Sequence, residues 1–187
     1  MTAILSGNRK ASMLARSLWE FFNFELYCSI HDDDGQPNRH RIEGILDPSS
    51  IGDVRIVISL RRSARQEEGL VHELLHANLI PLGYPTFWID EEQGSEKWQL
   101  AGGITNNAEH VVMLPIYLSL GCPKHRFLGA SRPPTDQERR VIADLVEMSP
   151  NLSTPDGYLT HVSAYLQRQN VTFRALHLAD AIVKKKI

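Results

Sequence analysis

The chain has 187 residues, of which 42% are hydrophobic and 22% are charged, with a formal net charge of −2 at pH 7. These values are typical of an ordinary globular protein that buries a sizeable core without disulfide bonds. The slightly acidic balance gives no sign of a nucleic-acid-binding surface, and no apolar run approaches the roughly 20 residues of a membrane span.

The two cysteines, Cys28 and Cys122, cannot build a disulfide framework, which favours a reducing compartment. The opening residues MTAILSGNRK lack the basic and apolar regions of a secretory signal. We therefore expect a cytoplasmic protein.

The first half of the chain predicts one helix and three strands. Residues 9–24 place Met13, Leu14 and Leu18 at helical spacing. Short β-rich segments follow, and the last has alternating apolar residues; the strands are predicted at 26–31, 39–46 and 53–60.

The rest of the chain is expected to be mainly helical. A helix over 61–80 ends at Pro81, and a loop rich in Pro and Gly leads to a second helix over about 105–120. Three C-terminal helices are predicted, opening near 135 and covering about 155–169 and 172–185. Strands followed by helices indicate an α+β fold.

The segment GLVHELLHA contains the spacing His-Glu-x-x-His at His72, Glu73 and His76. Two histidines four residues apart lie on the same side of a helix, so both imidazoles can bind one zinc ion. Glu73 is rotated about 100° from His72, where it can act as a general base on zinc-bound water. The motif therefore predicts two metal ligands and one catalytic carboxylate.

The surroundings of the motif support this interpretation over a chance pattern. Gly69 lies one turn before His72 on the same flank, where the absence of a side chain is expected to clear space above the histidines. The strand at 53–60 comes directly upstream and is expected to be an edge strand along which an extended peptide can pair.

Strand, linker and VHELLHA together resemble the core of zincin metallopeptidases, in particular compact cytosolic ones such as SprT-like and IrrE-like proteins. The resemblance covers residues 53–80 well and extends to about 120. The residues after His76 are ANLIPLG, so the metzincin continuation is absent. The resemblance implies a zincin-like α+β fold with a small, mostly antiparallel sheet. Its core would span 1–125, with a helical extension over 126–187 packed on it, unless the two form one single domain.

A third zinc ligand is expected in the segment 106–114, which is so apolar that we expect the helix to be buried on all sides. A buried Glu109 or His110 needs a partner, and a metal ion would supply one. Resemblance to IrrE-like and thermolysin-like proteins nominates Glu109, whereas SprT-like proteins nominate His110. We favour His110 because Tyr117 and other residues give it polar company on one face; Glu109 would then orient a ligand or contact substrate.

Other polar residues have weaker assignments. His31 and His40 flank the turn after the first strand and are expected to face solvent. Tyr84, Tyr117 and His161 are candidates for polarising a substrate carbonyl. No nucleophilic triad or phosphate-binding loop is present.

The sequence thus predicts a zinc-dependent metallopeptidase whose partner is a peptide or protein substrate, with no nucleic acid or membrane. The alternative is a binding or regulatory module on the same scaffold, with a structural or vestigial zinc ion. A catalytic zinc keeps one coordination position for water, whereas a structural one is closed by a fourth side chain.

Overall fold

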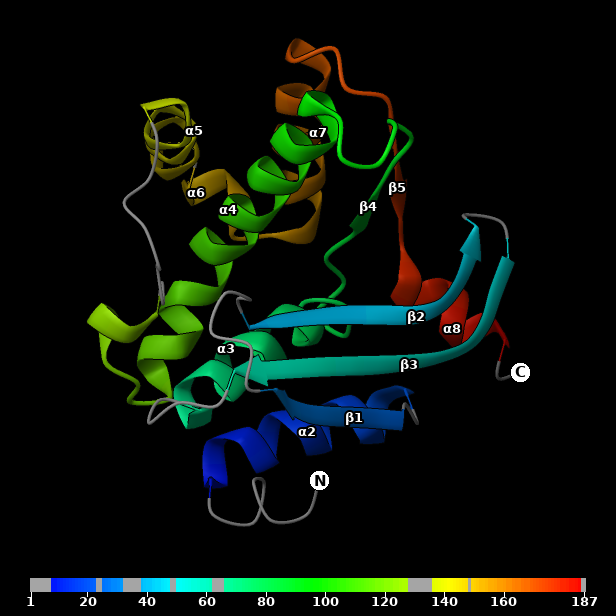
Figure 1. The fold of residues 1–187 in the computed structure, drawn as a ribbon, viewed down its shortest axis with the longest axis vertical. Helices are drawn as coiled ribbons and strands as arrows, with labels where there is room; N and C mark the ends of the chain where they lie inside the picture. Colours follow the sequence, from blue (N-terminus) through cyan, green and yellow to red (C-terminus); the bar gives the residue numbers. More distant parts are fainter. Residues whose placement is uncertain are drawn as a thin grey trace.

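The fold was obtained as a computed structural model, which describes residues 8–22, 25–31, 38–47, 50–61, 66–127, 136–147 and 149–185. It combines a small mixed sheet, a separate two-stranded ribbon and several helices, so the α+β class is confirmed (Figure 1).

The main sheet consists of β1 (Glu25–His31), β2 (Arg39–Asp47) and β3 (Ser50–Arg61), in the order β1-β3-β2. All three lie where strands are predicted. β2 pairs with β3 in antiparallel fashion, but β1 pairs with β3 in parallel, so the expectation of a mostly antiparallel sheet is wrong for this pair. Alternation of apolar residues indicates which face of a strand is buried, but it carries no information about the direction of the neighbouring strand.

β3 is the central strand, because it pairs with β1 along one side and with β2 along the other. The prediction that residues 53–60 form a free edge for a peptide is therefore wrong, since the backbone groups of β3 are already used. Within the described ranges, β2 pairs with β3 alone, which makes β2 an edge strand.

Two helices pack together beside the sheet: α2 (Arg9–Phe22) contacts β1, and α3 (Gln66–Asn78) contacts β3 and β2. Leu14 and Leu18 of α2 are buried as predicted, whereas Met13 is exposed. The buried amide of Asn78 joins the two helices, because its Nδ2 donates to the carbonyl oxygens of Leu74 (2.8 Å) and Leu14 (3.3 Å).

The long helix α4 (Glu96–Ser119) begins about ten residues before the predicted start. Ser95 caps it, accepting a hydrogen bond from the backbone N–H of Trp98 at 3.2 Å. The expected burial on all sides is wrong: Asn106 is exposed and Val111 is half-buried, because only one face packs into the core. None of the helices among the described residues has the length and apolar character needed to cross a bilayer.

After the short 3₁₀ turn η1 (Lys124–Arg126) come α5 (Asp136–Glu147), α6 (Ser149–Leu152) and α7 (Pro155–Arg168). α5, α6 and α7 contact α4. The prediction of one helix over 172–185 is wrong for the first half of this segment. This part forms β5 (Phe173–Leu176), and only α8 (Leu178–Lys185) is helical.

The strand conformation of β5 depends on a partner far away in the sequence. β5 pairs antiparallel with β4 (Thr86–Ile89), which lies in the segment expected to be a loop. The β4–β5 ribbon and the contacts of α7 with α4 tie residues beyond 125 to those before it (Figure 1).

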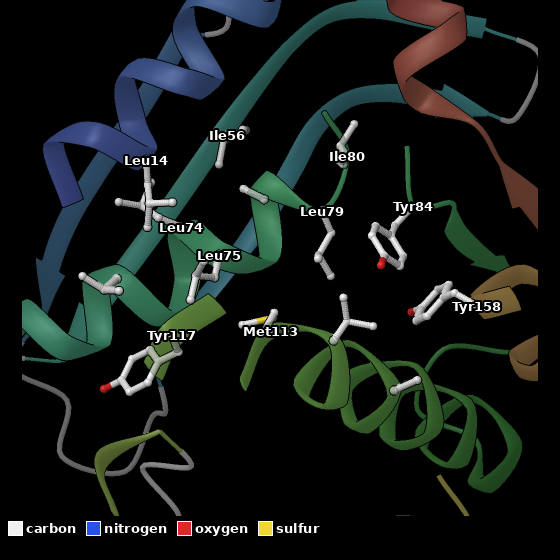
Figure 2. Packing of buried hydrophobic residues seen from close by; sticks show 14 of the residues in the cluster. Leu14, Ile56, Leu74, Leu75, Leu79, Ile80, Tyr84, Met113, Tyr117 and Tyr158 are labelled. Atoms are coloured by element: carbon white, nitrogen blue, oxygen red, sulfur yellow. The ribbon is translucent and has the colours of Figure 1, made fainter. Parts of the chain in front are cut away.

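The buried cluster of the protein runs from α2 and β3 through α3 to α4 and α7. Figure 2 shows Leu74 and Leu75 of α3 between Leu14 and Met113, and Tyr84 facing Tyr158 at the other end of the cluster. This packing fixes α3 against α4, and those two helices carry the candidate site.

Candidate metal centre

Three imidazoles converge where α3 packs on α4. His72 and His76 come from α3, and His110 comes from α4. Nε2 of His72 lies 3.2 Å from Nε2 of His76 and 3.2 Å from Nε2 of His110. The structure therefore brings together the two histidines of the motif and one of the two candidates for the third ligand.

This spacing suits a shared metal ion. Two ligand atoms about 2.1 Å from a tetrahedral metal ion lie about 3.4 Å apart. A single cation between the three nitrogens would engage all of their lone pairs. Without a metal ion, Nε2 of His72 has one proton or one lone pair, so it can make an ordinary hydrogen bond in only one of its two short contacts. The donor atoms of His72, His76 and His110 all lie within 4.8 Å of one another, and no fourth His, Cys, Asp or Glu of the described residues joins them.

The environment keeps two of these histidines neutral, which is the form that binds metal. Burial, followed by the neighbouring His76, lowers the pKa of His72 to about 4. Burial and the neighbouring imidazoles lower the pKa of His110 to about 2. Both values lie below the ordinary value of about 6.5, so both rings are uncharged at neutral pH.

Glu109 lies on the other side of His76. Nδ1 of His76 donates a hydrogen bond to Oε2 of Glu109, at 2.5 Å. This distance is shorter than the separation of two ligands on one metal and fits a strong hydrogen bond to a carboxylate. A proton on Nδ1 leaves the lone pair of Nε2 free to bind a metal.

The geometry therefore favours His110 as the third donor and Glu109 as the residue that orients His76. A second grouping of possible donors, His40, His76 and Glu109, also exists. In this grouping, His76 and Glu109 are already joined to each other by the hydrogen bond at Nδ1 of His76.

The carboxylate of Glu73 is almost completely buried on the same helix, 6% exposed. Burial by itself raises the pKa of this group, but the hydrogen bond from His40 and the further interactions with the neighbouring imidazoles outweigh burial and lower the pKa overall. Glu73 is thus ionised at neutral pH, as a general base must be.

His40 is a residue of the site that the sequence analysis missed. Its Nδ1 lies 3.0 Å from Oε2 of Glu73, and its ring stacks on His76 with centroids 4.6 Å apart and planes inclined by 16°. The expectation that His40 faces solvent is wrong. Its register partner on β3 is the buried Ile58, and residues directly opposite in an antiparallel pair project to the same face of the sheet. This face packs on α3.

Phe127 packs edge-on against two of the imidazoles. Its ring centroid lies 5.1 Å from that of His72 and 5.4 Å from that of His110. The neighbouring Arg126 donates to Glu68 of α3 at 3.1 Å, which ties the η1 segment to the helix of the motif. Phe127 therefore limits the rotation of His72 and His110 and shields them from solvent.

Gly69 has a different role from the one predicted. A Cβ atom at this position would collide with the side-chain amide of Asn38, the residue before β2. The glycine therefore makes room for Asn38 rather than for a ligand above the histidines.

A cavity of about 50 Å³ adjoins the Glu109 side of His76, and its walls include His40, Tyr84 and Tyr158. The hydroxyl of Tyr84 donates to the carbonyl of Ser153 at 2.8 Å, whereas the buried hydroxyl of Tyr158 has no partner among the described residues. Burial, and then the negative charge of Glu109, raise the pKa of Tyr158 far above 10, so it remains a hydrogen-bond donor.

Three residues were predicted from the sequence as hydrogen-bond donors to a substrate carbonyl, and the structure places each of them in a different environment. Tyr84 lines the cavity, but its hydroxyl is engaged. Tyr117 packs against Phe127, with centroids 5.0 Å apart, and His161 is absent from the cavity wall. Tyr158 was missed because a tyrosine at helical spacing in a C-terminal helix looks like any core residue.

Comparisons of the chain with family models, with curated proteins and with solved structures find no match. The function of the site therefore has to follow from its own geometry and chemistry.

Proposed function

We propose that the protein is a zinc-dependent metallopeptidase with a zincin-like arrangement of its catalytic residues. The observation that carries this proposal is the convergence of three Nε2 atoms, two of them from the helix that also carries the buried, ionised carboxylate of Glu73. His72, His76 and His110 would hold the ion. Three protein ligands, without a fourth from the described residues, correspond to a catalytic rather than a structural zinc site.

Each residue of the site has a defined task in this proposal. A zinc ion bound by the three imidazoles would supply Lewis acidity to a substrate carbonyl and to water. Glu73 accepts the proton of the attacking water and passes it to the leaving amine. Glu109 fixes the tautomer and orientation of His76 through the Nδ1 hydrogen bond.

The substrate in this proposal is an extended peptide that pairs with the edge of β2. β2 carries His40 toward Glu73, so a peptide along this strand would pass beside the metal ligands. The cavity next to His76 would receive a small group of the substrate, and Tyr158, whose buried hydroxyl has no partner among the described residues, lines this cavity.

The experiment compares wild type with Glu73→Gln in zinc content and in cleavage of unstructured peptides. We expect one zinc per chain in both proteins and a loss of at least about 100-fold in kcat for Glu73→Gln, because general acid–base catalysis contributes roughly 10²–10⁴-fold. Glu67→Gln, a change at an exposed glutamate of the same helix, is the matched control and should leave activity unchanged.

Two results would overturn the proposal. If the wild type retains zinc but cleaves no peptide in a broad peptide library, the binding or regulatory module with a structural zinc is the better account. If the purified protein has no affinity for zinc, neither account survives.

A further inference from the structure

We propose that His40 is a positioning residue for the general base: its Nδ1–H holds Oε2 of Glu73 and so directs the other carboxylate oxygen to the attacking water. This inference rests on the proposed peptidase function, and it adds a residue outside the His-Glu-x-x-His helix to the catalytic machinery.

The first observation is the contact itself. Nδ1 of His40 donates to Oε2 of Glu73 over 3.0 Å, with 25% of the His40 side chain and 7% of the Glu73 side chain exposed. A hydrogen bond to a carboxylate that is shielded from solvent in this way is little weakened by competition with water. Because it engages Oε2, the role of proton acceptor falls to Oε1.

The second observation is that His40 is held from two directions. Its ring stacks almost parallel on His76, with centroids 4.6 Å apart. Its backbone belongs to a paired segment of β2, in register with Ile58 of the central strand. Glu73, in contrast, has a long side chain with several rotatable bonds. A rigid donor that selects one rotamer therefore keeps the base near its reactive geometry before substrate arrives.

The stacking contact suggests a competing role, in which His40 only supports the metal ligand His76. The two roles use different parts of the side chain. Positioning of Glu73 needs the Nδ1–H donor, whereas support of His76 needs the flat aromatic ring. Two variants separate them: His40→Asn retains an N–H donor close to the position of Nδ1 but lacks the ring, and His40→Phe retains the ring but lacks the donor.

The test measures kcat, KM and zinc content of both variants beside wild type. Since loss of an orienting partner typically lowers activity 10–100-fold, we expect His40→Phe to lose at least about 10-fold in kcat, with KM and zinc content changed by less than about 2-fold. His40→Asn should stay within about 3-fold of the wild-type kcat. The inference is overturned if His40→Phe is as active as wild type, or if the two variants lose activity equally.

A second readout does not depend on turnover. In protein with ¹⁵N-labelled histidine, the Nδ1–H resonance of His40 should be observable and should move when Glu73 is replaced by Gln. It should not move in the control Glu67→Gln. A resonance indifferent to Glu73→Gln would show that the hydrogen bond is absent in solution and would overturn the inference.

Failure of this inference can be told apart from failure of the proposed function. If zinc-loaded wild type cleaves no peptide, the peptidase proposal fails and the positioning role fails with it. If wild type is active but His40→Phe matches it, only the role of His40 is wrong.

Discussion

Oε2 of Glu109 lies 2.5 Å from Nδ1 of His76, across the contact between α4 and α3. The next residue of α4, His110, places its Nε2 3.2 Å from Nε2 of His72, the other histidine of the motif. Neighbouring residues of a helix point about 100° apart, so one turn of α4 reaches both histidines of α3, with Glu109 at His76 and His110 at His72. These two contacts support our proposal that His110 is a metal ligand and that Glu109 orients His76.

Substitutions at these two positions should weaken zinc binding to different degrees. Glu109→Gln removes the charge that orients His76, and loss of such a partner costs about 10–100-fold in metal affinity. His110→Ala removes a ligand atom and should cost more than Glu109→Gln. Competition of each variant with a chromophoric chelator measures both affinities. A larger loss for Glu109→Gln would make Glu109 the ligand and contradict the assignment of His110.

Metal removal should lower thermal stability without unfolding the protein. A ligand present at 1,000 times its Kd stabilises the folded state by about 4 kcal/mol. The apolar cluster, which extends from α2 to α7, is independent of the three imidazoles, so the helices should persist after chelation. We expect EDTA to lower the Tm by several degrees while the far-ultraviolet circular dichroism at 20 °C is retained. EDTA should not alter the Tm of His110→Ala, and an equal shift in that variant would assign the effect to another site.

A side chain at Gly157, close to the junction between α6 and α7, should destabilise the protein. The N–H of this glycine donates to Oγ1 of Thr154 at 3.2 Å, and a Cβ there would run into the backbone carbonyl of Asn151. Because backbone cannot move aside as a flexible side chain can, Gly157→Ala should reduce the free energy of unfolding by about 1–3 kcal/mol or more.

Gly102→Ala is the matched control for that substitution. Gly102 is an exposed position inside α4, and a Cβ there meets no atom within 4 Å. The helical preference of Ala should stabilise the protein by about 0.5–1 kcal/mol. Urea denaturation of both variants gives the two values, and equal effects at the two positions would contradict the proposed collision.

Tyr158→Phe should separate stability from function. The buried hydroxyl has no partner among the described residues, so its removal leaves no broken hydrogen bond, and the free energy of unfolding should stay within about 0.5 kcal/mol of wild type or increase. If substrate uses this donor, kcat/KM for peptides should fall several-fold at unchanged zinc content. A marked loss of stability would instead show that the hydroxyl is hydrogen-bonded in solution, for example through water.

Local patterns predicted much of the secondary structure. The alternation of apolar residues in β3 and the helical spacing of Leu14 and Leu18 predict these two elements correctly. The reason is that the period of apolar residues within a short segment matches the period of the strand or helix that buries them. The spacing of His72, Glu73 and His76 predicted a metal-binding group for the same reason. All three residues lie on one helix, and helix geometry alone brings His72 and His76 to the same flank, with Glu73 about 100° from His72.

Other features depended on contacts between distant segments. β5 is a strand because β4 is its neighbour, and β1 runs parallel to β3 although no residue of either encodes the direction. His40 enters the site because the β2–β3 register turns it toward α3, and a shift of one residue would turn it away. By itself, the sequence determined which residues could bind a metal. Only the packing of α3 against α4 and β2 decided that Glu109 contacts His76 and that His40 contacts Glu73, because these contacts join residues 33 positions apart.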